Sequence, residues 1–372
     1  MEERRGLESG PMPTSRRTFL EEVSFASLIA GFPLSAQATL ARYAEKPPEP
    51  VYPKALRPGM TVALVAPSSP AWNPERNDVA VEVVESMGFK AKLFPHARDA
   101  TNYLAGSDEH RAADLNAAFA DSSVDAIFCL RGGYGASRIL PLLDYETIRK
   151  NPKVFTGYSD ITALLNAIHR LTGLVTFHGP IGGEMQSDYT LAAFKKVLTR
   201  ADAAGRVAEP PPFKASEGHV DVENRIYKLA PGKGKGRLVG GNISVFSTLV
   251  GTPFEPELKG RILFLEEVGE EPYRIDRWLT QFLLTGKLSG LAGVALGKFH
   301  DCGPKDYKPS FAGMGTWTWQ EVCQDRLGRL GVPVVANLVF GHVTDKATLP
   351  LGVMAELDGD AGTLTLLEPA VR

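Results

Sequence analysis

The sequence has little cysteine and almost no net charge. Its three cysteines, Cys129, Cys302 and Cys323, lie far apart along 372 residues without a C-x-x-C pair, which excludes a zinc knuckle or a dense disulfide framework. Its 41 basic and 43 acidic residues leave a formal charge of −2, whereas a nucleic-acid partner would require a basic excess. A small neutral or zwitterionic ligand is the better fit.

Two classes of cofactor motif are also missing. The sequence has no H-E-x-x-H pair and no dinucleotide-binding glycine pattern, so we expect neither a metal nor a cofactor. The segment PGKGKGR, residues 231–237, is not a phosphate loop, because no Ser or Thr follows a Gly-Lys pair and no strand precedes it. We expect a flexible basic loop there, near the cleft.

An apolar run long enough to span a membrane is absent as well. The apolar run near the start of the chain is shorter than such a span. Arg16 and Arg17 precede an apolar run from Val23 to Leu34, and small residues follow at 36–38. This pattern predicts a twin-arginine signal over residues 1–38, with passage through a membrane only during export and the periplasm as destination. The alternative is a tail with a short amphipathic helix on a cytoplasmic protein. Residues 39–58 are rich in proline and predict a linker.

Residues 59–205 alternate apolar runs with helical patterns, which predicts an α/β domain with a mostly parallel sheet. Ligands of such sheets bind beyond the carboxyl ends of the strands. The expected strands are 61–69, 91–96, 125–133, 153–159 and 174–180, and helices are expected over 77–88 and 107–121. Three strand ends carry polar residues, namely the Ser68-Ser69 pair, the segment 131–135 and Ser159.

Residues 206–225 lose this periodicity and predict an interdomain linker, followed by a β-rich domain over 226–372. β-like runs are expected over 237–253, 261–269 and 293–299, and a closing hairpin over 353–369. The pattern of residues 274–286 predicts a helix that Gly286 can end.

Ser159 lies in the segment GYSDITALLNAIHR and has two interpretations. Ser and Asp satisfy free N–H groups at any helix start, and Asp160 suits the positive end of a helix dipole. Alternatively, Gly157 lets the chain turn sharply after a strand and exposes Ser159 as a nucleophile, as in G-x-S-x-G turns. The residues following Ser159 match that pattern only in part.

A serine nucleophile needs a base, and the base needs an orienting carboxylate. His178, His300 and His342 all end apolar runs, and His342 is the most suggestive because Gly341 allows a close approach. Glu266 and Glu267 follow four apolar residues, and strand alternation points their side chains to opposite faces. The alternative is that one of them lies in solvent at the sheet edge while the other pairs with Arg274 or Arg277.

Seven segments in order resemble the LD-carboxypeptidases, a family of serine peptidases that includes murein tetrapeptide carboxypeptidases and microcin C7 self-immunity hydrolases. They span about Val62 to Leu351 and read APSSP, RGGYGASRILPLLDY, GYSDITALLNAI, TFHGP, GRLVGGNISV, LFLEEVGEEPYRIDRWLTQF and GHVTDKATLPLG. Each segment alone is a weak signal, but seven in order with plausible spacing are specific.

The resemblance implies a Rossmann-like parallel sheet, a smaller β-rich C-terminal domain, and a site in the cleft between them. By position it implies Ser159 as nucleophile, Glu266 as orienting acid and His342 as base. Backbone N–H groups of Asp160 and of Gly133 or Tyr134 are then expected to stabilise the oxyanion, with Arg131 and Gly132 binding substrate. The implied reaction releases a terminal D-amino acid from a muropeptide. The sequence does not decide whether the protein forms a homodimer.

The sequence is also compatible with two other functions. One is hydrolysis of a peptidyl or aminoacyl nucleotide, for which Trp317 and Trp319 are candidate stacking partners unless they pack in the core. The other is an exported protein that binds peptides without chemistry, which would give no reason for Ser159, Glu266 and His342 to occupy these positions.

Overall fold

The computed structural model describes residues 48–185, 187–303 and 316–372. The expected signal segment 1–38 lies outside the described residues, as does the first part of the expected linker. The second part of that linker is not extended into solvent, because Leu56 is buried and donates its N–H to Leu198. Within the described residues, no helix combines the length and the apolar character that crossing a membrane requires.

A first sheet forms in the N-terminal half of the described chain. Its strands are β1 (Thr61–Val65), β2 (Lys90–Leu93), β3 (Ala126–Cys129), β4 (Val154–Gly157), β5 (Thr176–His178) and β12 (Leu349–Leu351). Its order is β12-β5-β4-β3-β1-β2, and every neighbouring pair is parallel except β12 with β5. The parallel sheet expected from the sequence is therefore confirmed.

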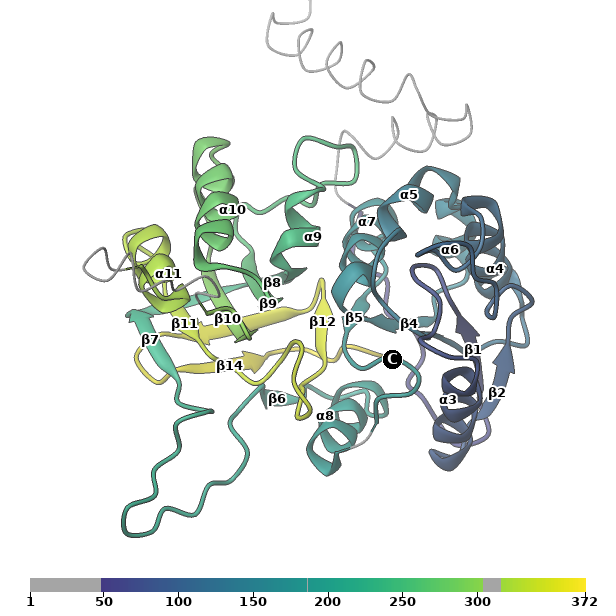
Figure 1. Ribbon diagram of the computed structural model, residues 1–372, viewed down its shortest axis with the longest axis horizontal. Helices are drawn as coiled ribbons and strands as arrows, with labels where there is room; N and C mark the ends of the chain where they lie inside the picture. The colour runs from purple at the N-terminus through teal and green to yellow at the C-terminus, as the bar shows by residue number, and fades with distance from the viewer. Residues whose placement is uncertain (1–47, 186, 304–315) are drawn as a thin grey trace, which may run out of the picture.

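Helices connect these strands and cover the sheet on both sides (Figure 1). They are α3 (Glu75–Ser86), α4 (Asp108–Ala120), α5 (Ala136–Ile139), the 3-10 turn η1 (Leu140–Leu142), α6 (Tyr145–Lys150), the 3-10 turn η2 (Ser159–Ile161), α7 (Thr162–Thr172) and α8 (Asp188–Leu198). Because the strands run parallel, the ends of β1, β3 and β4 meet at one edge, where their polar loops come together.

A second, mixed sheet has the order β6-β14-β13-β8-β9-β10-β11-β7. Its strands are β6 (Gly205–Val207), β7 (Tyr227–Ala230), β8 (Lys233–Asn242), β9 (Ile262–Val268), β10 (Gly293–His300), β11 (Val334–Ala336), β13 (Met354–Asp358) and β14 (Thr363–Leu366). The helices α9 (Ile243–Ser247), α10 (Pro272–Leu284) and α11 (Trp319–Leu327) lie on one face of it (Figure 1).

Strand alternation divides the core into two clusters. Along β9, Ile262 and Phe264 belong to the cluster shared with the first sheet, whereas Leu263 and Leu265 pack with α10 and α11. The second sheet therefore presents one face to its own helices and the other to the first sheet. This pattern decides where the two glutamates at the end of β9 point.

The two halves of the chain exchange strands. β6 lies at the expected end of the first domain but pairs with β14, and β12 comes from the C-terminal half but pairs with β5. Between β6 and β7 the chain forms the long loop that projects from the second sheet in Figure 1. The loop just before β12 thus reaches the edge of the first sheet, and it carries His342.

Two local expectations are wrong. Residues 231–237 were expected to form a flexible loop, but β8 begins at Lys233 and pairs with β13 on one side and with β9 on the other. The apolar run after Asn242 forms helix α9 instead of a continuing strand, because the Asn242 side chain accepts a hydrogen bond from the N–H of Val245 and caps the helix. Helix α10 and the closing hairpin of β13 and β14 agree with the sequence.

Candidate active site

Ser159 lies at a strained turn between β4 and α7. Its φ angle is +63°, a left-handed conformation that costs energy for any residue other than glycine. Gly132 packs directly against it, because a Cβ at that position would lie 2.8 Å from the Ser159 Cβ. The turn thus has the form of a nucleophile elbow, in which a serine follows a buried strand; here Ser159 is half-buried.

Asp160 ties together the loops at this sheet edge. Its buried carboxylate accepts hydrogen bonds from the Ser68 hydroxyl at 2.5 Å and from the N–H of Ala136 at 2.7 Å. Burial raises the pKa of Asp160, against the effect of these two hydrogen bonds. The side chain therefore fixes the ends of β1 and β3 beside Ser159, and does not cap α7 as the helix-start interpretation supposed.

Glu266 and His342 form a buried pair at the other side of the site. The Glu266 Oε2 lies 2.6 Å from the His342 Nδ1, and Glu266 is fully buried. Gly341 permits this approach with a φ angle of +107°, since a Cβ there would lie 2.7 Å from Glu266 Oε2. The Nδ1–H of His342 donates to the carboxylate, which leaves Nε2 for a second partner.

The pair shifts the pKa of both groups toward the charged form. Burial alone would lower the pKa of His342, but the charge of Glu266 and its hydrogen bond raise it overall. Burial alone would raise the pKa of Glu266, but the charge of His342 and the same hydrogen bond lower it overall. An imidazolium that forms at His342 is thus stabilised by an ionised Glu266.

Glu267 points to the opposite face of β9, as alternation requires, but it is neither in solvent nor paired with an arginine. It is buried and accepts hydrogen bonds from the Asn242 amide at 2.9 Å and from the N–H of Ser244 at 3.0 Å. Burial and the neighbouring charge of Glu266 raise its pKa to about 7. The alternative in which one of the two glutamates pairs with Arg274 is wrong, because Arg274 pairs with Glu270.

Two cavities flank His342. One, of about 370 Å³, is lined by Ser159 and His342 together with Arg131, Gly132 and Gly133. The structure therefore brings the expected nucleophile, the expected base, the two expected substrate-binding residues and one expected oxyanion donor to one space. The Arg131 guanidinium lies 3.5 Å from the ring of Trp72, an exposed residue that lines the same cavity.

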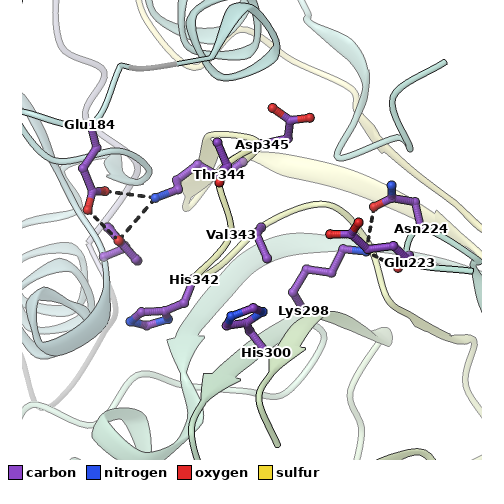
Figure 2. Close-up of a pocket in the computed structure, with 11 residues that line it drawn as sticks. Glu184, Glu223, Asn224, Lys298, His300, His342, Val343, Thr344 and Asp345 are labelled. Carbon is purple, nitrogen blue, oxygen red and sulfur yellow. Dashed lines mark hydrogen bonds and ion pairs between the residues drawn. The ribbon is translucent and has the colours of Figure 1, made fainter. Parts of the chain in front are cut away.

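The second cavity, of about 550 Å³, shares His342 with the first and carries charges of both signs. Figure 2 shows Glu223, Asp345, Lys298 and His300 around it. The Lys298 Nζ donates to the Glu223 carbonyl oxygen at 2.8 Å, which holds the returning end of the long loop against β10.

Of the two alternatives for the second oxyanion donor, Gly133 and Tyr134, the N–H of Tyr134 is already engaged. The N–H of Tyr134 donates to the Ser69 hydroxyl at 3.0 Å, and that hydroxyl donates to the Tyr103 carbonyl oxygen at 2.7 Å. This geometry argues against Tyr134 and leaves Gly133, which lines the cavity with Ser159, as the remaining candidate for the second donor.

Sequence reasoning missed a set of groups that lie beside His342, of which Tyr158 contacts its ring. The ring of Tyr158 lies 4.8 Å from the His342 ring, and its hydroxyl donates to Glu184 at 3.0 Å. The Lys346 Nζ lies 2.9 Å from Glu184 and 4.4 Å from the Tyr158 ring centroid. Tyr158 directly precedes the predicted nucleophile, and Lys346 lies four residues after the predicted base; this proximity in sequence is the signal that could have found them.

His178 lies behind the site with its ring among Tyr158, Phe264 and Phe340. Burial lowers its pKa to about 4, so the ring is neutral at physiological pH. It is therefore a structural residue. His300 lines the larger cavity but not the one that Ser159 lines. Of the three histidines that end apolar runs, His342 is the one hydrogen-bonded to Glu266.

Two family models match the chain. The model for the LD-carboxypeptidase N-terminal domain matches residues 62–179, and the model for the LD-carboxypeptidase C-terminal domain matches residues 235–357. Together they include Ser159, Glu266 and His342.

Curated relatives and solved structures extend over most of the chain. A probable murein peptide carboxypeptidase of Bacillus subtilis is 37% identical over 82% of this chain and 91% of its own length. A murein tetrapeptide carboxypeptidase of Pseudomonas aeruginosa is 31% identical over 80% and 93%. The structure of the self-immunity protein MccF with glutamyl sulfamoyl guanosine is 28% identical, covers 87% of this chain and 100% of its own, and superimposes with a TM-score of 0.77.

Proposed function

The chain belongs to the LD-carboxypeptidase family, and from this premise we propose that it is a serine carboxypeptidase that releases the terminal D-amino acid from peptidoglycan tetrapeptides. The observation that carries the proposal is the 2.6 Å contact between His342 and the buried Glu266, on the wall of the cavity that contains Ser159. The names of the murein peptidase relatives support the substrate class.

In the proposed reaction the Ser159 oxygen attacks the carbonyl carbon of the L-configured residue while its proton passes to His342 Nε2. The N–H groups of Asp160 and Gly133 stabilise the oxyanion. The intermediate collapses, the C–N bond breaks, and the amine of the D-amino acid leaves with the proton from His342. Water, deprotonated by His342, then hydrolyses the acyl ester and regenerates Ser159.

The charges beside His342 support a zwitterionic substrate. The larger cavity offers the carboxylates of Glu223 and Asp345 for an ammonium group and the imidazole of His300 for a carboxylate. A tetrapeptide whose third residue is meso-diaminopimelate carries both groups on one side chain. The overall charge of −2 is compatible with such a small ligand.

Release of D-alanine from L-Ala-D-Glu-meso-diaminopimelate-D-Ala tests the proposal. We expect release by the wild-type protein and none by Ser159→Ala, with the same folded far-ultraviolet spectrum for both. Absence of release by the wild type across about pH 6 to 9 would refute the assignment. Tight peptide binding without turnover would instead favour the alternative that the protein binds peptides without cleaving them.

Hydrolysis of a peptidyl or aminoacyl nucleotide is a second candidate, and Trp72 is the observation that favours it. This exposed indole lines the cavity of Ser159 and can stack on a nucleobase. Trp319, by contrast, stacks on Phe299 in the core of the second sheet. Trp319 is therefore a packing residue. A comparison of kcat/KM on the two substrates decides, and Trp72→Ala should lower only the value for the nucleotide.

A further inference from the structure

Two histidines and one aspartate converge on the surface of the first domain. His96 and Asp99 lie in the loop after β2, and His110 lies in the first turn of α4. The Asp99 Oδ2 is 3.0 Å from the His96 Nδ1 and 2.9 Å from the His110 Nδ1. The ligand atoms of the three side chains all lie within 4.8 Å of one another.

The two imidazole rings stack on one another beside the Asp99 carboxylate. Their centroids are 3.8 Å apart and their planes differ by 22°. Both Nδ1 atoms face the same oxygen. Ligand atoms that each lie 2.0–2.2 Å from one ion are roughly 3 to 4 Å from one another. The side chains of His96, Asp99 and His110 therefore need only small movements for an ion to replace the hydrogen bonds between them.

The backbone that carries these groups is fixed before any ion binds. The N–H of His96 donates to the buried carboxylate of Asp114 at 2.9 Å, which ties the loop to α4 one turn beyond His110. The N–H of Asp99 donates to the His96 carbonyl oxygen at 3.0 Å. Preorganisation of this kind favours ion binding, because the ligands lose little freedom.

We propose that His96, Asp99 and His110 bind a divalent transition-metal ion of the zinc class, with a fourth position open to water. Two imidazole nitrogens and one carboxylate oxygen favour zinc, cobalt or nickel over magnesium or calcium, which prefer oxygen ligands. The side chains are 32%, 35% and 51% exposed, so an ion can enter directly from solvent.

The ion is structural, because none of its three ligands lines the two cavities beside His342. It would fix the loop that runs from β2 to α4. That loop supplies Tyr103, whose carbonyl oxygen accepts from Ser69 and whose ring meets Tyr134 edge-on at 5.4 Å. A bound ion would therefore stabilise the contacts of Tyr103 with Ser69 and Tyr134, next to Gly133, which lines the Ser159 cavity. The proposal stands independently of the substrate.

Cobalt and zinc titrations of the untagged, chelator-stripped protein test the site. We expect one equivalent of Co²⁺ to bind with visible d–d absorption, and Zn²⁺ to displace it. His96→Ala, Asp99→Ala and His110→Ala should each weaken Zn²⁺ binding at least roughly tenfold, as loss of one ligand in three requires. His219→Ala is the matched control, because His219 is also exposed but lies in a separate turn with Ser216.

A second measurement covers variants with altered folding. Zn²⁺ should raise the Tm of the wild type and of His219→Ala but not that of His110→Ala, since an ion raises Tm only by binding the folded state more tightly than the unfolded state. Binding of no equivalent, unchanged binding by His110→Ala, or equal affinity for Mg²⁺ would each overturn the proposal.

Discussion

At the scale of single residues, Ser159 combines a reactive position with an unfavourable backbone conformation. Its φ angle of +63° belongs to the region that favours glycine. We expect Ser159→Ala and Ser159→Gly to be equally inactive, and Ser159→Gly to unfold with a free energy about 1 kcal/mol above that of Ser159→Ala. Ser86, within α3, should show the reverse order in the same pair of substitutions. Denaturant unfolding measures both; the same order at the two sites would contradict the strained turn.

The two glutamates at the end of β9 should differ sharply in their effect on rate. Glu266→Gln leaves the shape intact but misorients His342, so we expect kcat to fall at least roughly a hundredfold. Glu267→Gln should keep kcat within about threefold of the wild type, because Glu267 contacts Asn242 and Ser244 on the far face. Steady-state kinetics on the tetrapeptide compares them. A larger loss in Glu267→Gln would show that the assignment of the acid is wrong.

The pH dependence of kcat/KM should report His342. A base must be neutral to accept the Ser159 proton, and the pKa of His342 is raised above the ordinary value of 6.5 despite its burial, because of Glu266. Activity should therefore fall as pH drops, with a midpoint above 6.5. Since Glu266→Gln removes the charge that raises this pKa, its residual activity should show a midpoint at lower pH. An unmoved midpoint would mean that another group titrates.

At the scale of elements, the glycines of residues 231–237 are the test of strand β8. A Cβ at Gly234 would overlap the carbonyl oxygen of Ala292, whereas a Cβ at Gly303 would meet nothing within 4 Å. We expect Gly234→Ala to lower the free energy of unfolding by roughly 1–3 kcal/mol, as overpacking does, and Gly303→Ala to change it little. Equal stability of the two variants in urea would favour the flexible loop over the strand.

At the scale of the whole molecule, the paired arginines near the start lead to a proposal about location. We propose that Arg16 and Arg17 direct export by the twin-arginine route, as their place before a short apolar run suggests. Replacement of both by Lys should leave full-length protein in the cytoplasm, while wild-type protein appears outside it starting near Thr39. Cell fractionation with mass spectrometry measures this. The same distribution for both proteins would indicate a tail without targeting function.

The sequence by itself determined the elements and the chemistry they could carry. Periodicity placed all five parallel strands, and alternation put Glu266 and Glu267 on opposite faces of β9. The order of seven segments identified the family, and Gly341 marked the close approach of His342 to Glu266. These features are local, so a linear reading finds them.

Only the tertiary structure decided which groups meet. β12 returns to the first sheet and carries the His342 loop with it, so a histidine of one half comes to the serine of the other. The engaged N–H of Tyr134, the buried partners of Glu267 and the convergence of His96 with His110 likewise depend on contacts between separate elements. Composition and spacing cannot supply these, because side chains that converge are set by strand order, register and the packing of the loops between them.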